Sequence, residues 1–169
     1  MRPVMVWLRG LTLFVAGIVV GTLMMQRTAA QENDKAGLRL NHVGIAVSDF
    51  QGSLDFYTKV MGFKVAYAMP SPDGKPTTTF LQINKDTFIE MAPATANLPA
   101  GLTHIGLMAD DAKAAIARLR EGGATVPDAR SGGATGSILT NVQDPNKIRL
   151  EIVEQPAGSM MRKAIESWK

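Results

Sequence analysis

The chain contains only two histidines, and a glutamate follows each of them at nearly the same distance. His42 and His104 are 62 residues apart (104 − 42), and each is followed by a β-branched residue and a glycine. Glu90 follows His42 by 48 residues (90 − 42), and Glu151 follows His104 by 47 residues (151 − 104). Imidazole nitrogens and carboxylate oxygens are common ligands of divalent transition metals. We therefore predict that a duplicated fold brings the four side chains to one shared metal ion.

The first thirty residues have the composition of an export leader. They contain three arginines, no acidic residue, and an uncharged apolar run at residues 10–26. Small residues at 28–30 suit a signal peptidase, so we predict a signal peptide at residues 1–30 and a periplasmic or extracellular protein. The alternative is an uncleaved N-terminal membrane anchor at residues 10–26, although a full span needs about 20 apolar residues. Residues 31–37 are polar and are predicted as a linker.

Charge and cysteine content exclude several classes of partner and site. The net charge of +3 lies entirely in the leader, because residues 31–169 contain fifteen basic and fifteen acidic residues. No basic cluster with interleaved aromatic residues occurs there, so we expect no nucleic-acid partner. The chain has no cysteine, which leaves histidine and carboxylate side chains to hold any metal. We expect a small-molecule substrate, and contact with a membrane only through an uncleaved leader.

Hydrophobic periodicity predicts one order of elements, β-α-β-β-β, twice in succession. In the first repeat, residues 38–91, a helix between the first two strands is predicted to begin at Ser48. Gln51 would complete a capping box with Ser48, and Gly62 would end the helix. The predicted strands are Leu38–Val47, Phe63–Met69, Thr77–Ile83 and Thr87–Met91.

The second repeat, residues 102–154, has a predicted helix at Asp111–Glu121 that ends at Gly122-Gly123. Pro127 places one of its strands at a sheet edge. The glycine-rich segment 131–136 precedes a strand and not a helix, so we predict a flexible loop at the mouth of the site rather than a phosphate loop. The predicted strands are Leu102–Ala109, Thr125–Ala129, Ser137–Val142 and Lys147–Glu154.

The C-terminal tail, residues 156–169, is predicted to be helical. Its segment Ser159–Trp168 has the periodicity of a short amphipathic helix, with Met161 and Ile165 on one side. We expect this helix to pack over a sheet edge or a partner chain.

Strand alternation places the four candidate ligands on one face of the sheet. Val43 and Ile45 share the face that the helix of the first repeat should cover, and His42 shares the opposite face with Gly44. The same alternation holds in the second repeat. We therefore expect all four ligands on the concave side of the sheet, where the glycines beside the histidines leave room for a metal and a ligand.

The doubled layout and several motifs resemble the vicinal oxygen chelate superfamily. This family includes glyoxalase I, methylmalonyl-CoA epimerase, bleomycin-resistance proteins and extradiol dioxygenases. The resemblance covers residues 38–155 and implies an α+β fold, in which two βαβββ repeats form a cup-shaped, partly closed sheet with helices on the outside. The segments that carry it are His42–Val47, Ser53–Tyr57, Met61–Phe63 and Asp144–Asn146 with the following Leu150-Glu151.

The resemblance also implies a site and a chemistry. The family's ligands come from the first and fourth strands of each half, which are His42, Glu90, His104 and Glu151 here. The complete set is similar to that of glyoxalase I and implies one divalent metal ion (Ni, Co, Zn, Mn or Fe). It implies a lyase or isomerase that transfers a proton next to a metal-bound carbonyl of a small oxygenated metabolite, with Glu151 or Glu90 as the catalytic base.

Two other functions stay open at this point. One is an Fe(II)-dependent dioxygenase, and the other is a metal-free small-molecule binding protein of the resistance type. A homodimer is expected. The resemblance implies that the two halves close the cup either within one chain or with the halves of a second chain. The sequence does not decide between these two arrangements.

Overall fold

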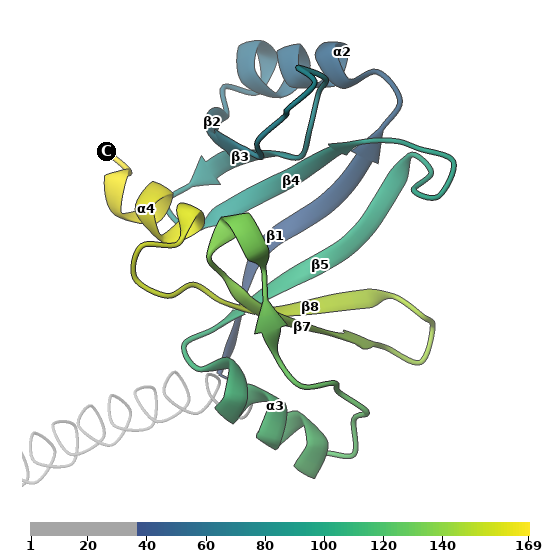
Figure 1. Cartoon of the computed structure of the whole chain (residues 1–169), viewed down its shortest axis with the longest axis vertical. Helices are drawn as coiled ribbons and strands as arrows, with labels where there is room; N and C mark the ends of the chain where they lie inside the picture. The colour runs from purple at the N-terminus through teal and green to yellow at the C-terminus, as the bar shows by residue number, and fades with distance from the viewer. Residues whose placement is uncertain (1–36) are drawn as a thin grey trace, which may run out of the picture. The chain divides into compact units, whose positions relative to one another are not determined.

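The computed structural model describes residues 37–169, and the predicted leader lies outside them. The described residues form one eight-stranded sheet in the order β2-β3-β4-β1-β5-β8-β7-β6 (Figure 1). No helix in this part of the chain is long and apolar enough to cross a membrane. The strands are β1 Leu38–Val47, β2 Lys64–Ala68, β3 Thr79–Asn84, β4 Thr87–Pro93, β5 Gly101–Ala109, β6 Arg130–Ser131, β7 Ile138–Gln143 and β8 Arg149–Glu154.

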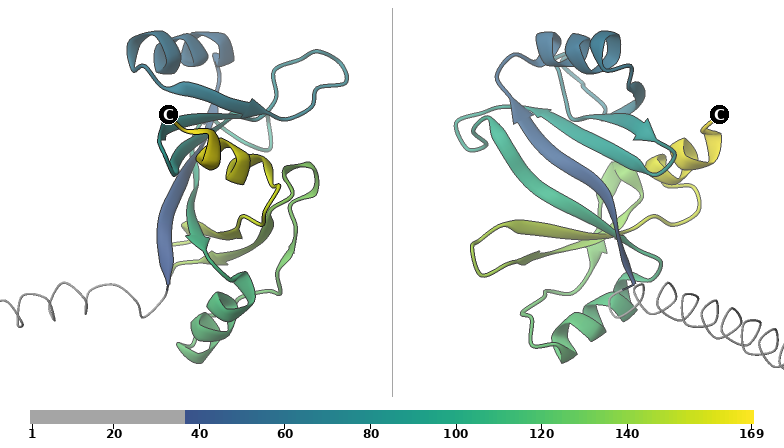
Figure 2. Two further views of the ribbon diagram at one scale, coloured as in Figure 1. Left: turned by 90° about the vertical axis from the view of Figure 1, so that its left-hand side faces the viewer. Right: turned by 180° about the vertical axis from the view of Figure 1, so that it is seen from behind.

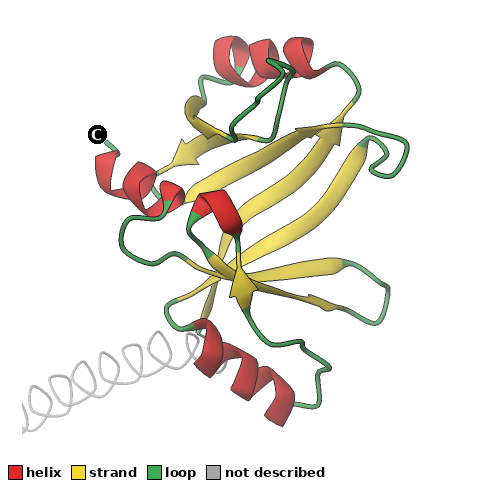
Figure 3. Ribbon diagram, viewed as in Figure 1, coloured by secondary structure: helices red, strands yellow, loops and turns green. Residues whose placement is uncertain are grey.

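The order of elements confirms the predicted pair of β-α-β-β-β repeats and the α+β fold. β1 pairs in parallel with β4, β5 pairs in parallel with β8, and the antiparallel pair β1–β5 joins the two halves. The helices α2 and α3 lie at opposite ends of the sheet (Figure 3). The helical segments are α2 Phe50–Asp55, its continuation η1 Phe56–Val60, α3 Ala112–Glu121, the 3-10 turn η2 Gly133–Thr135 and α4 Met160–Ser167.

The start of α2 differs from the prediction. Asp49 caps this helix, because its carboxylate accepts a hydrogen bond from the backbone N–H of Gly52 at 2.9 Å. The predicted N-cap Ser48 and its capping box are therefore wrong. Gln51 does not reach back but donates to Asp55 at 2.9 Å. An aspartate offers the same acceptor as a serine and adds negative charge at the positive end of the helix dipole.

The edge strand of the second repeat is also shorter than predicted. Residues 125–129 form no strand, and β6 contains only Arg130 and Ser131, paired with β7. Pro127 has no N–H to donate to a ladder, and its carbonyl accepts a hydrogen bond from the Thr140 hydroxyl at 2.9 Å. The other seven strand predictions are confirmed, with ends that shift by two residues at most.

Both faces of the sheet bury side chains. On the outer face, Ala115 and Leu119 of α3 pack with Ile152 of β8. Along β1 the alternation is as predicted, because His42 and its same-face neighbours are buried while Val43 and its neighbours are half-buried. The concave face is therefore the better covered of the two.

The C-terminal helix α4 supplies part of that cover. It lies beside the edge strand β2, where Lys64 places its ammonium group 4.6 Å from the ring centre of Trp168 (Figure 2). This position confirms the expected packing near a sheet edge. Met161 and Ile165 of α4 also enter the core cluster on the concave face, which includes Phe80, Phe88, Met108 and Val153.

Candidate metal centre

The two central strands bring the histidines together. In the pairing of β1 with β5, His42 lies opposite Gly106 and His104 lies opposite Gly44. The Nε2 atoms of the two rings are 2.9 Å apart. A Cβ atom on either glycine would overlap the ring of the histidine opposite. The glycines therefore make room for the imidazole rings, which corrects the expectation that they make room for a metal and its ligand.

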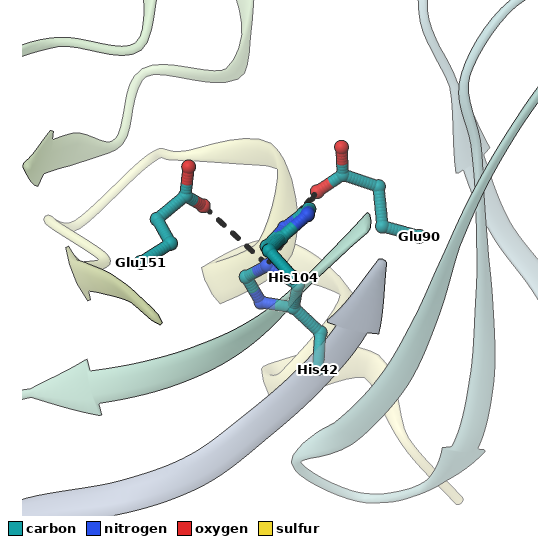
Figure 4. A group of neighbouring side chains, drawn as sticks. All are labelled: His42, Glu90, His104 and Glu151. Atoms are coloured by element: carbon teal, nitrogen blue, oxygen red, sulfur yellow. Dashed lines mark hydrogen bonds and ion pairs between the residues drawn. The ribbon is translucent and has the colours of Figure 1, made fainter. Parts of the chain in front are cut away.

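The two glutamates complete the cluster from the flanking strands (Figure 4). Glu90 of β4 lies beside Gly44, and Glu151 of β8 lies beside Gly106. Oε2 of Glu90 is 3.5 Å from Nε2 of both histidines, and Oε2 of Glu151 is 3.4 Å from Nε2 of His42. One candidate ligand atom from each of the four residues lies within 4.8 Å of the others. All four predicted residues thus meet within a single chain.

The spacing of these atoms suits a single metal ion. Ligand atoms bound at about 2.1 Å lie about 3.0 Å apart when adjacent and about 4.2 Å apart when opposite in an octahedral site. The separation of 2.9 Å matches adjacent ligands, and the separations of 3.4 and 3.5 Å lie between the adjacent and the opposite values. Two nitrogens and two carboxylates without sulfur suit Ni, Co, Zn, Mn or Fe, and this donor set does not select among them.

A β-bulge precedes each histidine. The pairing of β1 with β5 skips Asn41 on one strand and Thr103 on the other. A bulge redirects the side chains next to it, and here each skipped residue places an oxygen against the following ring. Oδ1 of Asn41 is 3.0 Å from Nδ1 of His42, and Oγ1 of Thr103 is 2.9 Å from Nδ1 of His104. The sequence analysis missed both residues, although a polar residue before each histidine was a usable signal.

Asn41 fixes the tautomer of His42. The Asn41 amide donates to the carbonyl of Asp86 at 3.0 Å, so its oxygen must face the ring. Nδ1–H of His42 then donates to that oxygen, and Nε2 keeps its lone pair for the cluster. Asn41 is 0% exposed, so close packing also holds this arrangement.

His104 is held differently. Arg149 places a guanidinium nitrogen 2.7 Å from Nδ1 of His104. A guanidinium can only donate, so Nδ1 accepts and Nε2 carries the hydrogen that is shared with His42. Metal binding through Nε2 of His104 requires the other tautomer, in which Nδ1–H donates to Thr103. Arg149 therefore competes with a metal ion for the tautomer of His104.

A cavity of 220 Å³ opens beside the cluster and is lined by His42, Glu90 and Glu151 among others. Tyr67, which stacks on Phe80 with ring centres 4.4 Å apart, forms part of another wall. Burial raises the pKa of Tyr67, and nearby Glu90 raises it further, so the phenol remains a hydrogen-bond donor.

The carboxyl group of Glu151 is ionised in this setting. Burial works to raise the pKa of Glu151, but the interactions of its carboxylate with His42, His104 and the charged Arg149 outweigh burial and lower the pKa. An ionised carboxylate is the form that binds a metal ion.

These features and the sequence place the chain in a known family. It belongs to the Glyoxalase/Bleomycin resistance protein/Dioxygenase superfamily, whose family model matches residues 39–152. A lactoylglutathione lyase of Escherichia coli is 30% identical over 128 residues, which cover 70% of this chain and 93% of that protein. A lactoylglutathione lyase of Neisseria meningitidis is 29% identical over 129 residues, which cover 72% and 94%. The relatives' names support an enzyme of the lyase or isomerase type.

Solved structures share the fold. Methylmalonyl-CoA epimerase of Streptomyces coelicolor, in complex with 2-nitronate-propionyl-CoA, superposes with a TM-score of 0.59 at 24% identity and covers 72% of this chain and 96% of its own. The Mn(II)-bound glyoxalase from Novosphingobium aromaticivorans has a TM-score of 0.56 at 20% identity and covers 69% of this chain and 38% of its own. These similarities confirm the predicted cup of two βαβββ repeats.

Proposed function

We propose that the chain is a metal-dependent lyase or isomerase of the glyoxalase type that acts on a small oxygenated substrate. The observation that carries the proposal is the cluster of two histidines and two glutamates, which opens on a 220 Å³ cavity. A divalent ion held by these residues would polarise a substrate carbonyl and acidify the neighbouring C–H group.

The side chains of the cluster have distinct tasks in this proposal. His42 offers a neutral Nε2 whose orientation Asn41 sets, and His104 offers the second nitrogen. Glu90 and Glu151 both line the cavity, so either carboxylate is within reach of a substrate proton. The Glu90 side chain is 25% exposed and that of Glu151 is 12% exposed. The greater exposure of Glu90 favours it as the carboxylate that leaves the ion and moves the proton.

Metal content is the first test. The full chain is purified without chelator or affinity metal and is examined by elemental analysis. We expect close to one equivalent of a divalent transition metal, and its loss in the double variant His42→Ala/Glu151→Ala. Glu121→Ala, an exposed position on α3, is the matched control and should keep the metal. Absence of metal even after reconstitution would instead favour the metal-free binding protein.

Proton transfer is the second test. The metal-loaded chain is incubated with hydroxyacetone in deuterated water, and proton NMR follows the loss of the C–H signal beside the carbonyl. We expect exchange that requires the metal and is abolished in Glu90→Gln or Glu151→Gln. Bound iron together with consumption of dioxygen would favour the dioxygenase. The absence of both proton exchange and conversion of methylglyoxal hemithioacetals would contradict the proposed chemistry.

We also propose that the protein is exported, on the strength of the arginine-containing start and the apolar run at residues 10–26. Cell fractionation with N-terminal sequencing tests this proposal. A mature protein that begins at residue 31 outside the cytoplasm supports cleavage, and an intact chain in the membrane fraction supports the anchor. An intact chain in the cytoplasm contradicts both. The homodimer stays a prediction, and the cluster of four side chains needs no second copy to complete it.

A further inference from the structure

The walls of the cavity contain no positively charged side chain. Among residues 37–169, its lining includes the carboxylates Glu90 and Glu151 but no lysine or arginine. Arg149, which contacts Nδ1 of His104, is not part of the lining. The other polar groups on the walls are neutral and belong to Tyr67, Thr78, Thr135, Ser137 and Gln155.

This distribution of charge determines which substrates the cavity can hold. Two carboxylates balance one divalent ion, so the loaded site has no excess positive charge. A carboxylate or phosphate on the substrate would enter a partly buried space beside two acidic groups without a cation to pair with. Burial of such a charge is strongly unfavourable. The hydroxyl groups and the Tyr67 phenol suit uncharged oxygen atoms instead.

The helix α4 limits the size of the substrate. Met161 of α4 is 2% exposed and lines the cavity together with apolar side chains such as Met69 and Leu139. The cavity has a volume of 220 Å³. Ligand cavities for drug-sized molecules are larger, at about 300–1,000 Å³.

α4 is a fixed wall of the cavity. Ser159 at its start donates to the Gln155 side chain at 3.0 Å, and Gln82 of β3 donates to the carbonyl of Ala164 at 3.3 Å. A Cβ atom on Gly136 would meet the backbone of Ser159, so the loop around η2 also packs closely on this helix. The family match ends at residue 152, before α4 begins.

From these features, and resting on the function proposed above, we propose that the site selects a small, uncharged substrate with two adjacent oxygen atoms. A small hydroxyketone such as hydroxyacetone has this chemistry and fits the volume. An anionic group would not be accommodated in the part of the substrate that enters this cavity. Met161 is the residue that sets the size limit.

Binding of a matched pair of compounds tests the charge requirement. Hydroxyacetone and hydroxypyruvate differ only in that a carboxylate replaces a methyl group. The full chain is loaded with Mn(II), dialysed free of excess metal, and titrated with each compound while the paramagnetic relaxation of the CH₂ protons is measured. We expect hydroxyacetone to bind at least tenfold more tightly than hydroxypyruvate. Equal or tighter binding of hydroxypyruvate, or no saturable relaxation of either compound, would overturn the inference.

A variant of α4 tests the size requirement. A hydroxyketone that bears a naphthyl group in place of the methyl group should not bind to the wild-type chain. Met161→Ala should admit it, with at least a tenfold gain over wild type. Met160→Ala removes the same atoms from the neighbouring residue, which does not line the cavity, and should show no gain. A gain in both variants, or in neither, contradicts the role of Met161.

The outcomes separate the substrate class from the chemistry. Because relaxation reports binding without turnover, selective binding of hydroxyacetone without proton exchange would support the substrate class and contradict the proposed lyase or isomerase. Proton exchange without discrimination between the two compounds would support the proposed lyase or isomerase and contradict the substrate class.

Discussion

The imidazole ring of His42 fills the space above Gly106, which lies opposite it on the first strand of the other repeat. The reciprocal contact places the ring of His104 above Gly44. Each half of the molecule thus provides the gap that receives the histidine of the other half. This exchange explains how two side chains 62 residues apart come to share one site.

We predict that Gly106→Ala disrupts the site. The new methyl group would overlap the ring of His42, so the ring must turn away from Glu90 and Glu151. Forced overpacking of this kind costs about 1–3 kcal/mol of stability. Metal affinity, measured by competition with a chromogenic chelator, should fall at least a hundredfold. Gly122→Ala is the matched control, because a Cβ atom there makes ordinary contacts of 3.4 and 3.5 Å, and it should bind metal as wild type does.

The sequence predicts the repeat, most strands and the four clustered residues because each depends on a local pattern. Strand alternation alone places His42 on the concave face, and the nearly equal histidine-to-glutamate spacings show the duplication. The edge strand at Thr125–Ala129 is predicted wrongly, since Pro127 and neighbouring β-branched residues give opposite local signals. The pairing partner decides that segment, and the sequence does not reveal it.

The features missed around the site are those that depend on contacts between distant elements. Nothing local to Arg149 shows that it reaches the ring of His104, because that contact requires β5 and β8 to be neighbours. The contribution of Met161 to the cavity likewise depends on where α4 returns to the sheet. The bulges at Asn41 and Thr103 are partly predictable. A polar residue that interrupts the strand pattern marks each position, but it does not reveal the register shift.

Asn41 should control metal affinity through His42. In Asn41→Leu the Nδ1–H of His42 loses its acceptor and the ring loses its preferred tautomer. Changes of this kind beside a metal ligand lower affinity by about 10–100-fold, and isothermal titration with Zn(II) or Ni(II) measures the effect. Asn41→Asp keeps an acceptor for Nδ1–H and should bind metal more tightly than Asn41→Leu. If the two variants lose affinity equally, the hydrogen bond to His42 does not explain the effect.

Unlike Asn41, Arg149 should weaken metal binding. Its guanidinium favours the tautomer of His104 that keeps a hydrogen on Nε2, and its charge repels a cation nearby. We expect Arg149→Met to raise metal affinity by about tenfold, the equivalent of about 1.4 kcal/mol. Arg149→Lys keeps the charge but changes the donor geometry. A metal affinity between those of wild type and Arg149→Met would show that both the charge and the tautomer of His104 contribute. A weaker affinity in Arg149→Met would show that Arg149 supports the metal-bound state instead.

Metal binding should stabilise the folded chain, because the four ligands converge only in the folded state. A ligand present at a hundred times its dissociation constant contributes about 2.7 kcal/mol. For a domain of this size that amount corresponds to a rise in Tm on the order of 5–10 °C, measurable by circular dichroism with and without chelator. Glu151→Gln should remove this rise, since a neutral amide replaces one of two carboxylates that balance the ion. Glu121→Gln, on the exposed surface of α3, should retain the full rise. An equal rise in both variants would place the stabilising metal away from the cluster.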